Sequence, residues 1–272
     1  MIQTKSYQVL NNFDVKVIGI ILMFIDHVHQ MFAGAGVPGW VDWFGRPVAT
    51  IFFFMAVEGF IHTRNQKRYM FQLLVGFWIM NLGSPIVQHF FEVGNLALSN
   101  NIFTDLYIAV LAMYGIQEIS VGRRTHHSKQ ILLGGLAIIA PILLSLLALG
   151  LIANPKTMMF AANLAMVIPT IMLAENGLLL YIGVFFYLFR NNRLLQCLTV
   201  LVFAFLDAGI NSGFAFTGLF TSNTQWMMIF AIIPILLYNG QKGRSMKYFF
   251  YLFYPIHIWL LFILASLMGV GE

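Results

Sequence analysis

The stretch GIILMFIDHVHQMF (residues 19–32) has the composition of a membrane-spanning helix but contains polar side chains that hydrocarbon cannot solvate. With the residues before it, the apolar run is roughly 20 residues long, enough to cross the hydrocarbon core of a bilayer. Asp26, His27 and His29 lie inside this run. A charge near the middle of a bilayer costs roughly 3 kcal/mol or more, and ionisable residues at such positions usually serve a function.

The composition extends this interpretation to the whole chain. Of the 272 residues, 60% are hydrophobic and only 9% are charged, whereas an ordinary soluble domain has about 25% charged residues. The pattern predicts an all-α fold, a polytopic bundle of about ten transmembrane segments that forms a single integral-membrane domain over residues 1–272. The expected spans are 14–33, 47–62, 69–91, 101–118, 131–152, 157–174, 177–190, 194–211, 225–239 and 247–269.

The loops between the expected spans are short and basic, which indicates a multi-pass protein of the cell membrane. Positive charge in short loops marks the cytoplasmic side. The basic residues that predict a cytoplasmic N-terminus are Arg64, Lys67, Arg68, Arg123, Arg124 and Lys129. A strict count of ten spans places Lys242, Arg244 and Lys247 outside, against the same rule, so one segment between 157 and 190 is expected to be re-entrant or merged with its neighbour. The net charge of +5 lies mostly in these loops and does not indicate nucleic-acid binding.

The polar residues of the first span share a helix face. Lys16 and His27 are eleven residues apart, which is close to three helical turns and roughly 16 Å along the axis. Asp26 and His29 are three residues apart, a spacing that permits a pair. A histidine is the side chain that exchanges protons near neutral pH, as general base catalysis requires. The alternative is an interhelical hydrogen-bond cluster in which Lys16 extends to the lipid headgroups.

Ionisable residues in two further spans are candidates for the same site. Glu58 and His62 in the second span have the four-residue spacing of a helical pair, and Arg46 lies at its boundary. In the last span, Pro255 predicts a kink and His257 follows it. Because a carboxylate or imidazole facing lipid is costly, we expect Glu58 and His257 to share one polar chamber with His27.

Three segments of the chain resemble one family. FDVKVIGIILMFIDHV (13–28), FGRPVATIFFFMAVEGFIHTRN (44–65) and YFFYLFYPIHIWLLFIL (248–264) resemble the TraX family, named for a conjugative-plasmid protein required to acetylate the N-terminus of F-type pilin. The family is in turn similar to the acyltransferase-3 superfamily, whose first span carries a basic residue, ten further residues and a histidine. Lys16 and His27 match that spacing, with lysine where arginine is usual, and Glu58 stands where the second-span motif often has serine.

The resemblance implies a membrane acyltransferase with His27 as the catalytic histidine and Lys16 near the acyl donor, acetyl-CoA. Chemistry adds Asp26 and Glu58, because carboxylates can orient an imidazole and stabilise its protonated form, and His257 as a further catalytic candidate. The cations expected to attract the donor's phosphates are Lys16, Arg46, Arg64, Lys67 and Arg68. The acceptor would be an unidentified group in or across the membrane, on a peptide N-terminus, a glycan or a lipid. No metal is expected, since the single Cys197 excludes a cysteine-cluster site.

Two other functions are compatible with the same residues. A proton-coupled transporter would use the intramembrane acids and histidines as a relay, and a non-catalytic scaffold would use them only for packing. Transporters often show repeated halves, and this sequence has no evident internal repeat. GxSxG, HExxH and P-loop motifs are also absent from the sequence, so it does not support serine hydrolysis, zinc proteolysis or nucleotide hydrolysis.

Overall fold

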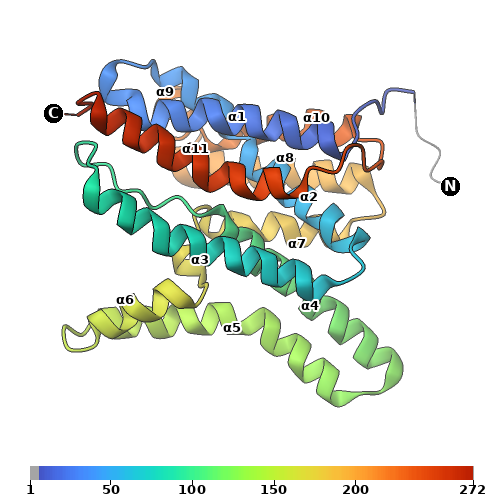
Figure 1. Cartoon of the computed structure of the whole chain (residues 1–272). Helices are drawn as coiled ribbons and strands as arrows, with labels where there is room; N and C mark the ends of the chain where they lie inside the picture. Colours follow the sequence, from blue (N-terminus) through green and yellow to red (C-terminus); the bar gives the residue numbers. More distant parts are fainter. Residues whose placement is uncertain (1–5, 272) are drawn as a thin grey trace. The chain divides into compact units, whose positions relative to one another are not determined.

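The computed structural model describes residues 6–271, and within this range the regular structure is helical. Figure 1 shows the helices. Seven helical segments in the described range are long and apolar enough to cross a membrane, as an all-α membrane bundle requires. The main helices of these segments are α1 (Asn12–Phe32), α2 (Val48–His62), α3 (Gln66–Phe90), α4 (Ile102–Thr125), α5 (Ser128–Ile152), α8 (Arg193–Ser212) and α11 (Lys247–Leu267).

The remaining helices are short. They are η1 (Ala33–Ala35), η2 (Gly39–Phe44), α6 (Met158–Val167), η3 (Ile171–Leu173), η4 (Gly177–Leu180), α7 (Tyr181–Leu188), α9 (Phe216–Thr221), η5 (Gln225–Ala231) and α10 (Ile232–Leu237). The spans expected at 157–174, 177–190 and 225–239 are therefore shorter apolar helices of 10–17 residues. One cause is local: Pro169 forces the preceding Ile168 into an extended conformation, so α6 ends at Val167.

The chain forms two compact units that alternate along the sequence. Unit 1 contains residues 1–55, 86–98 and 188–272, and unit 2 contains residues 56–85 and 99–187. Two of the four boundaries fall well within helices, inside α2 after Met55 and inside α3 after Pro85. The boundary after Leu98 lies in the segment between α3 and α4, and the boundary after Tyr187 lies at the end of α7.

In unit 1, α1 and α11 run side by side in the same direction (Figure 1). Phe13 packs edge-to-face on Phe250 near the start of both helices, with ring centroids 6.1 Å apart. Helix α1 begins with a capping box, in which the Asn11 side chain accepts from the backbone of Asp14 and the Asp14 carboxylate accepts from the backbone of Asn11. This box fixes the start of α1 and hence the register of every residue on it.

The N-terminal segment pairs with the loop between α10 and α11. Leu10 donates to the carbonyl of Leu237 over 2.9 Å and accepts from the amide of Asn239 over 2.8 Å, and Asn12 donates to Gln241 over 2.7 Å. The loop with Lys242 therefore lies at the same end of unit 1 as the start of α1. This corrects the strict ten-span count, which placed the two on opposite sides.

In unit 2, the longest helix pair is held together by two glycines. Helices α4 and α5 approach so closely that a Cβ on Gly115 would meet the carbonyl oxygen of Gly134 at 2.5 Å, and the reverse contact is equally close. Small residues of this kind let helix backbones approach in a membrane, where van der Waals packing replaces the hydrophobic effect.

We expect Gly134→Ala to destabilise the protein by about 1–3 kcal/mol, because the new methyl group overpacks against backbone that cannot move aside. The matched control is Gly135→Ala, where a Cβ meets nothing within 4 Å. That control should be neutral or stabilising, since alanine has the higher helix propensity. Thermal unfolding of both variants in one detergent measures the difference, and equal melting temperatures would contradict the close approach.

Candidate functional site

The structure brings His27 and His257 into direct contact within unit 1, although 230 residues separate them. His27 Nδ1 lies 2.8 Å from His257 Nε2, and the two ring centroids are 4.9 Å apart. The two residues are only 3% and 5% exposed, so the contact is inside the unit and neither ring faces lipid. In this buried setting a hydrogen bond between the rings is strong, and each ring constrains the other.

The hydrogen-bond partners determine which ring nitrogens carry protons. His257 Nδ1 lies 2.6 Å from the carbonyl oxygen of Phe253, which can only accept, so His257 Nδ1 is protonated. In neutral His257, Nε2 is then an acceptor, and His27 Nδ1 must donate to it. Neutral His27 therefore carries its proton on Nδ1, which leaves Nε2 unprotonated. This is the protonation state that a general base needs.

The surroundings of His257 fix the position of its ring. Phe253 stacks on it with the centroids 4.6 Å apart and the planes at 16°. Tyr254 packs edge-on against both histidines, at 6.2 Å from His27 and 5.9 Å from His257. Pro255 lies within α11 at this point, as expected from the sequence. The imidazole of His257 is thus held by a backbone bond and aromatic packing, and it can position His27.

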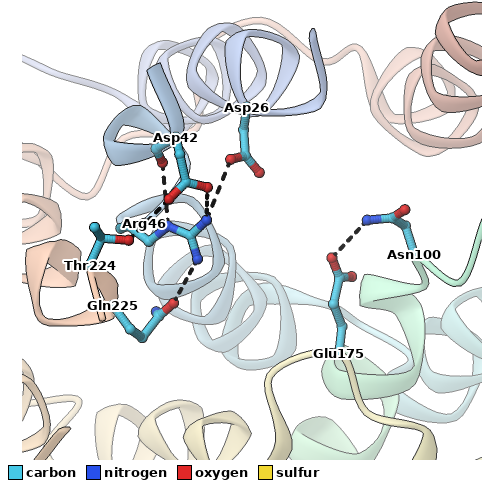
Figure 2. A network of polar contacts seen from close by, with 7 residues as sticks. All are labelled: Asp26, Asp42, Arg46, Asn100, Glu175, Thr224 and Gln225. Carbon is cyan, nitrogen blue, oxygen red and sulfur yellow. Dashed lines mark hydrogen bonds and ion pairs between the residues drawn. The ribbon is translucent and has the colours of Figure 1, made fainter. Parts of the chain in front are cut away.

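A second polar cluster lies near the far end of α1 and is centred on Arg46 (Figure 2). Its guanidinium contacts the carboxylate of Asp42, lies 4.0 Å from Asp26 and donates to Gln225 over 3.3 Å. Thr224 donates to Asp42 over 3.0 Å. The cluster joins α1, η2 and η5 through charge-assisted hydrogen bonds.

This cluster shows the contacts of two residues that the sequence analysis assigned to the site, Asp26 and Arg46. Asp26 contacts Arg46, and the Asp26–His29 pair that the spacing permits is not formed. We expected Arg46 among the donor-binding cations. It lies beside Asp26. Asp26 is ten residues after Lys16, which corresponds to roughly 15 Å along α1. The role of Arg46 in donor binding stays a prediction. A Cβ on Gly45 would collide with the Asp26 carboxylate, so a glycine is needed here.

Lys16 lies at the other end of α1, among cations that the sequence analysis did not assign to the site. Its ammonium is 5.4 Å from the ring centroid of Phe250 and within electrostatic range of Lys242 and Lys247. The signal was present in the sequence as a basic segment, NGQKGRSMK, but its side of the membrane was ambiguous from the span count alone. The contact with Leu10 resolves that ambiguity.

The other candidates belong to unit 2. Glu58 is buried and forms the expected pair with His62, with Glu58 Oε2 3.7 Å from His62 Nδ1. The same Nδ1 donates to the Glu58 carbonyl over 2.9 Å. Arg64, Lys67 and Arg68 are exposed beyond the end of α2. Their roles in donor binding, and that of Glu58 beside His27, remain predictions.

Asp105 shows how a buried acid can be structural. It is fully buried in α4, and its two oxygens accept from the backbone amides of Glu175 and Asn176, each over 2.9 Å. Asn100 donates to the Glu175 carboxylate over 3.2 Å (Figure 2). These bonds satisfy backbone donors of the turn before η4 and anchor it to α4.

The model of the TraX protein family matches residues 12–265 of the chain. The chain belongs to the TraX family. A curated relative, "Probable fimbrial assembly protein FimC, serogroup H1" of Dichelobacter nodosus, is 27% identical over 277 residues, covering 92% of this chain and 93% of the relative. No solved structure shows significant similarity to the chain.

The match to the TraX family includes both histidines and the lysines Lys16, Lys242 and Lys247. It begins at the first residue of α1 and ends near the end of α11, so it covers the two helices that carry His27 and His257. The family assignment inferred from the three sequence segments is therefore confirmed. The geometry of the histidine pair adds the protonation states, which a sequence match does not contain.

Proposed function

We propose that this chain is an acyltransferase of the cell membrane that transfers an acetyl group from acetyl-CoA to an acceptor in or across the membrane. The observation that carries the proposal is the hydrogen-bonded series His27, His257 and the Phe253 carbonyl, which leaves His27 Nε2 as the base. A base oriented by a second group is the recurring arrangement of enzymes that activate a nucleophile.

The reaction would proceed by direct attack. His27 Nε2 removes a proton from the acceptor amine or hydroxyl while the acceptor atom bonds to the thioester carbonyl carbon. The tetrahedral intermediate then collapses, the carbon–sulfur bond breaks, and the imidazolium returns the proton to the thiolate. The products are an amide or ester and free coenzyme A. Because His27 is only 3% exposed, the packing around it must open to admit the substrates.

The acceptor is suggested by the relatives. The TraX family resemblance implies pilin, and the relative from Dichelobacter nodosus is described as a fimbrial assembly protein. We therefore propose an extracytoplasmic subunit of a surface fibre as the acceptor. The basic end of unit 1, with Lys16, Lys242 and Lys247, would face the cytoplasm by the positive-inside rule, on the side where acetyl-CoA is found.

The proton-relay transporter is the alternative from the sequence, and the histidine pair argues against it. The relay in that alternative would include Asp26 and Glu58 as well as the two histidines, but on the His257 side the hydrogen bond goes to the Phe253 carbonyl, which does not take up protons. The pair is therefore suited to orienting one imidazole rather than to passing protons along the membrane.

The proposal is tested with purified protein in lipid nanodiscs, supplied with acetyl-CoA labelled in the acetyl group. The acceptor probes are a pilin N-terminal peptide and membrane extract from cells that lack this protein. We expect label in one acceptor fraction and stoichiometric release of coenzyme A thiol. Label in none of the peptide, protein, glycan and lipid fractions would refute acyl transfer, and proton uptake by sealed vesicles would instead favour the transporter.

A further inference from the structure

The parallel packing of α1 and α11 repeats one arrangement on two helices. On α1, Lys16 precedes His27 by eleven residues, and on α11, Lys247 precedes His257 by ten. At about 1.5 Å per residue these separations are roughly 16 Å and 15 Å. The two histidines are in contact, and Lys16 is near Lys247. Along its axis the helix pair therefore has two levels: a cationic level with Lys16 and Lys247, and an imidazole level with His27 and His257.

The cationic level is completed by the loop between α10 and α11. Its backbone is fixed to the start of α1, because Gln241 accepts from Asn12 over 2.7 Å. Gly243 has a φ of +63°, and a Cβ there would collide with the Asn11 side chain, so the loop packs directly on the α1 cap. Lys242 is therefore held beside Lys16 by the fold.

The charge at this end is strongly positive. The segment from Tyr238 to Tyr248 contains Lys242, Arg244 and Lys247 and no acidic residue. The nearby acid of α1, Asp14, accepts from the backbone of Asn11 within the capping box. Like charges this close repel one another, and an anion between them removes the repulsion. Lysine ammonium groups are established ligands of phosphate.

We propose that Lys242 and Lys247, on the loop and the start of α11, complete with Lys16 a binding site for the diphosphate of a coenzyme-A thioester. This inference rests on the proposed acyltransferase function and assigns the donor to residues of α11 and its preceding loop. The pantetheine arm of coenzyme A separates the diphosphate from the thioester by a chain of about the length between the two levels. A donor held by these lysines thus extends along α1 and α11 and presents its thioester at His27.

The test is coenzyme A binding, measured by calorimetry in neutral-lipid nanodiscs in a His27→Asn background, which removes the base without altering the lysines. We expect Lys242→Ala and Lys247→Ala each to weaken coenzyme A binding by about tenfold, the effect of losing one charge-assisted contact. Lys129→Ala removes the same charge from the loop between α4 and α5 and should leave binding unchanged. Lys16→Arg retains the charge and should bind nearly as well as the background protein.

Two further ligands separate the possible sources of the anion. Pantetheine, which lacks the phosphates, should bind weakly and equally to the background protein and both alanine variants. Nanodiscs containing phosphatidylglycerol should compete only weakly with coenzyme A. If this lipid abolishes coenzyme A binding, the lysines form a headgroup site and the inference is wrong.

The outcomes also distinguish this inference from the function on which it rests. Coenzyme A binding that is equally tight in the Lys242, Lys247 and Lys129 variants would overturn the lysine site and leave the acyltransferase proposal intact. The absence of coenzyme A binding to protein with all lysines present would overturn both, because no donor would then be held.

Discussion

Replacing His27 with asparagine is expected to reduce acetyl transfer by about 10²–10⁴-fold, the usual contribution of a general base. The asparagine side-chain nitrogen occupies nearly the position of His27 Nδ1 and can still donate to His257 Nε2. It has no basic nitrogen at the Nε2 position. The variant therefore removes the base and keeps the hydrogen bond that the fold uses.

Three measurements make this result specific. Thermal unfolding and coenzyme A binding of His27→Asn should match those of the unsubstituted protein, because the buried donor remains satisfied. His29→Ala is the matched control, since His29 lies on the same helix but outside the histidine pair. It should retain nearly full activity. Transfer by His27→Asn at the unsubstituted rate would exclude His27 as the base.

The second large effect is expected at His257, which acts as a positioning residue. His257→Leu removes the buried hydrogen bond between His27 Nδ1 and His257 Nε2, at a cost of about 0.5–1.5 kcal/mol in stability. Without His257 Nε2 as an acceptor, the His27 ring is held less firmly in one orientation. We expect kcat to fall by about tenfold or more, while the KM for acetyl-CoA changes little.

The conservative variant separates positioning from packing. His257→Gln places an amide oxygen near the position of Nε2, where it can accept from His27 Nδ1, but the amide carries no imidazole. It should recover most of the kcat lost in the leucine variant. Equal losses in both variants would mean that the His257 imidazole itself takes part in proton transfer, and unchanged rates in both would remove it from the site.

Much of the fold follows from the hydropathy of the sequence. In a bilayer every backbone N–H and C=O must be satisfied within the chain, so long apolar segments must be helical. That constraint predicted the all-α bundle and the first span, which contains the polar residues at the expected positions. The lengths of three expected spans differ from the structure: Pro169 shortened one of them, and the two others are short apolar helices.

The candidate site was predictable in its residue types and only partly in its partners. His27 stood out because an ionisable residue inside an apolar segment is costly. The spacing rule correctly paired Glu58 with His62, because both lie on one helix. It failed for Asp26, whose partner Arg46 comes from a different element. Spacing describes contacts within a helix and contains no information on contacts between helices.

Local sequence thus determined that the chain is a membrane protein and where its helices lie. It also determined the position of each polar group along the axis of its helix, because that position depends on a rise of about 1.5 Å per residue. The pairing of α1 with α11 was decided by tertiary packing. That pairing brings His257 to His27 across 230 residues, assigns the proton to His27 Nδ1 and sets Lys242 and Lys247 beside Lys16. The physical reason is that apolar helices of similar composition offer many packing partners of similar energy. Only the complete set of steric fits and hydrogen bonds selects one.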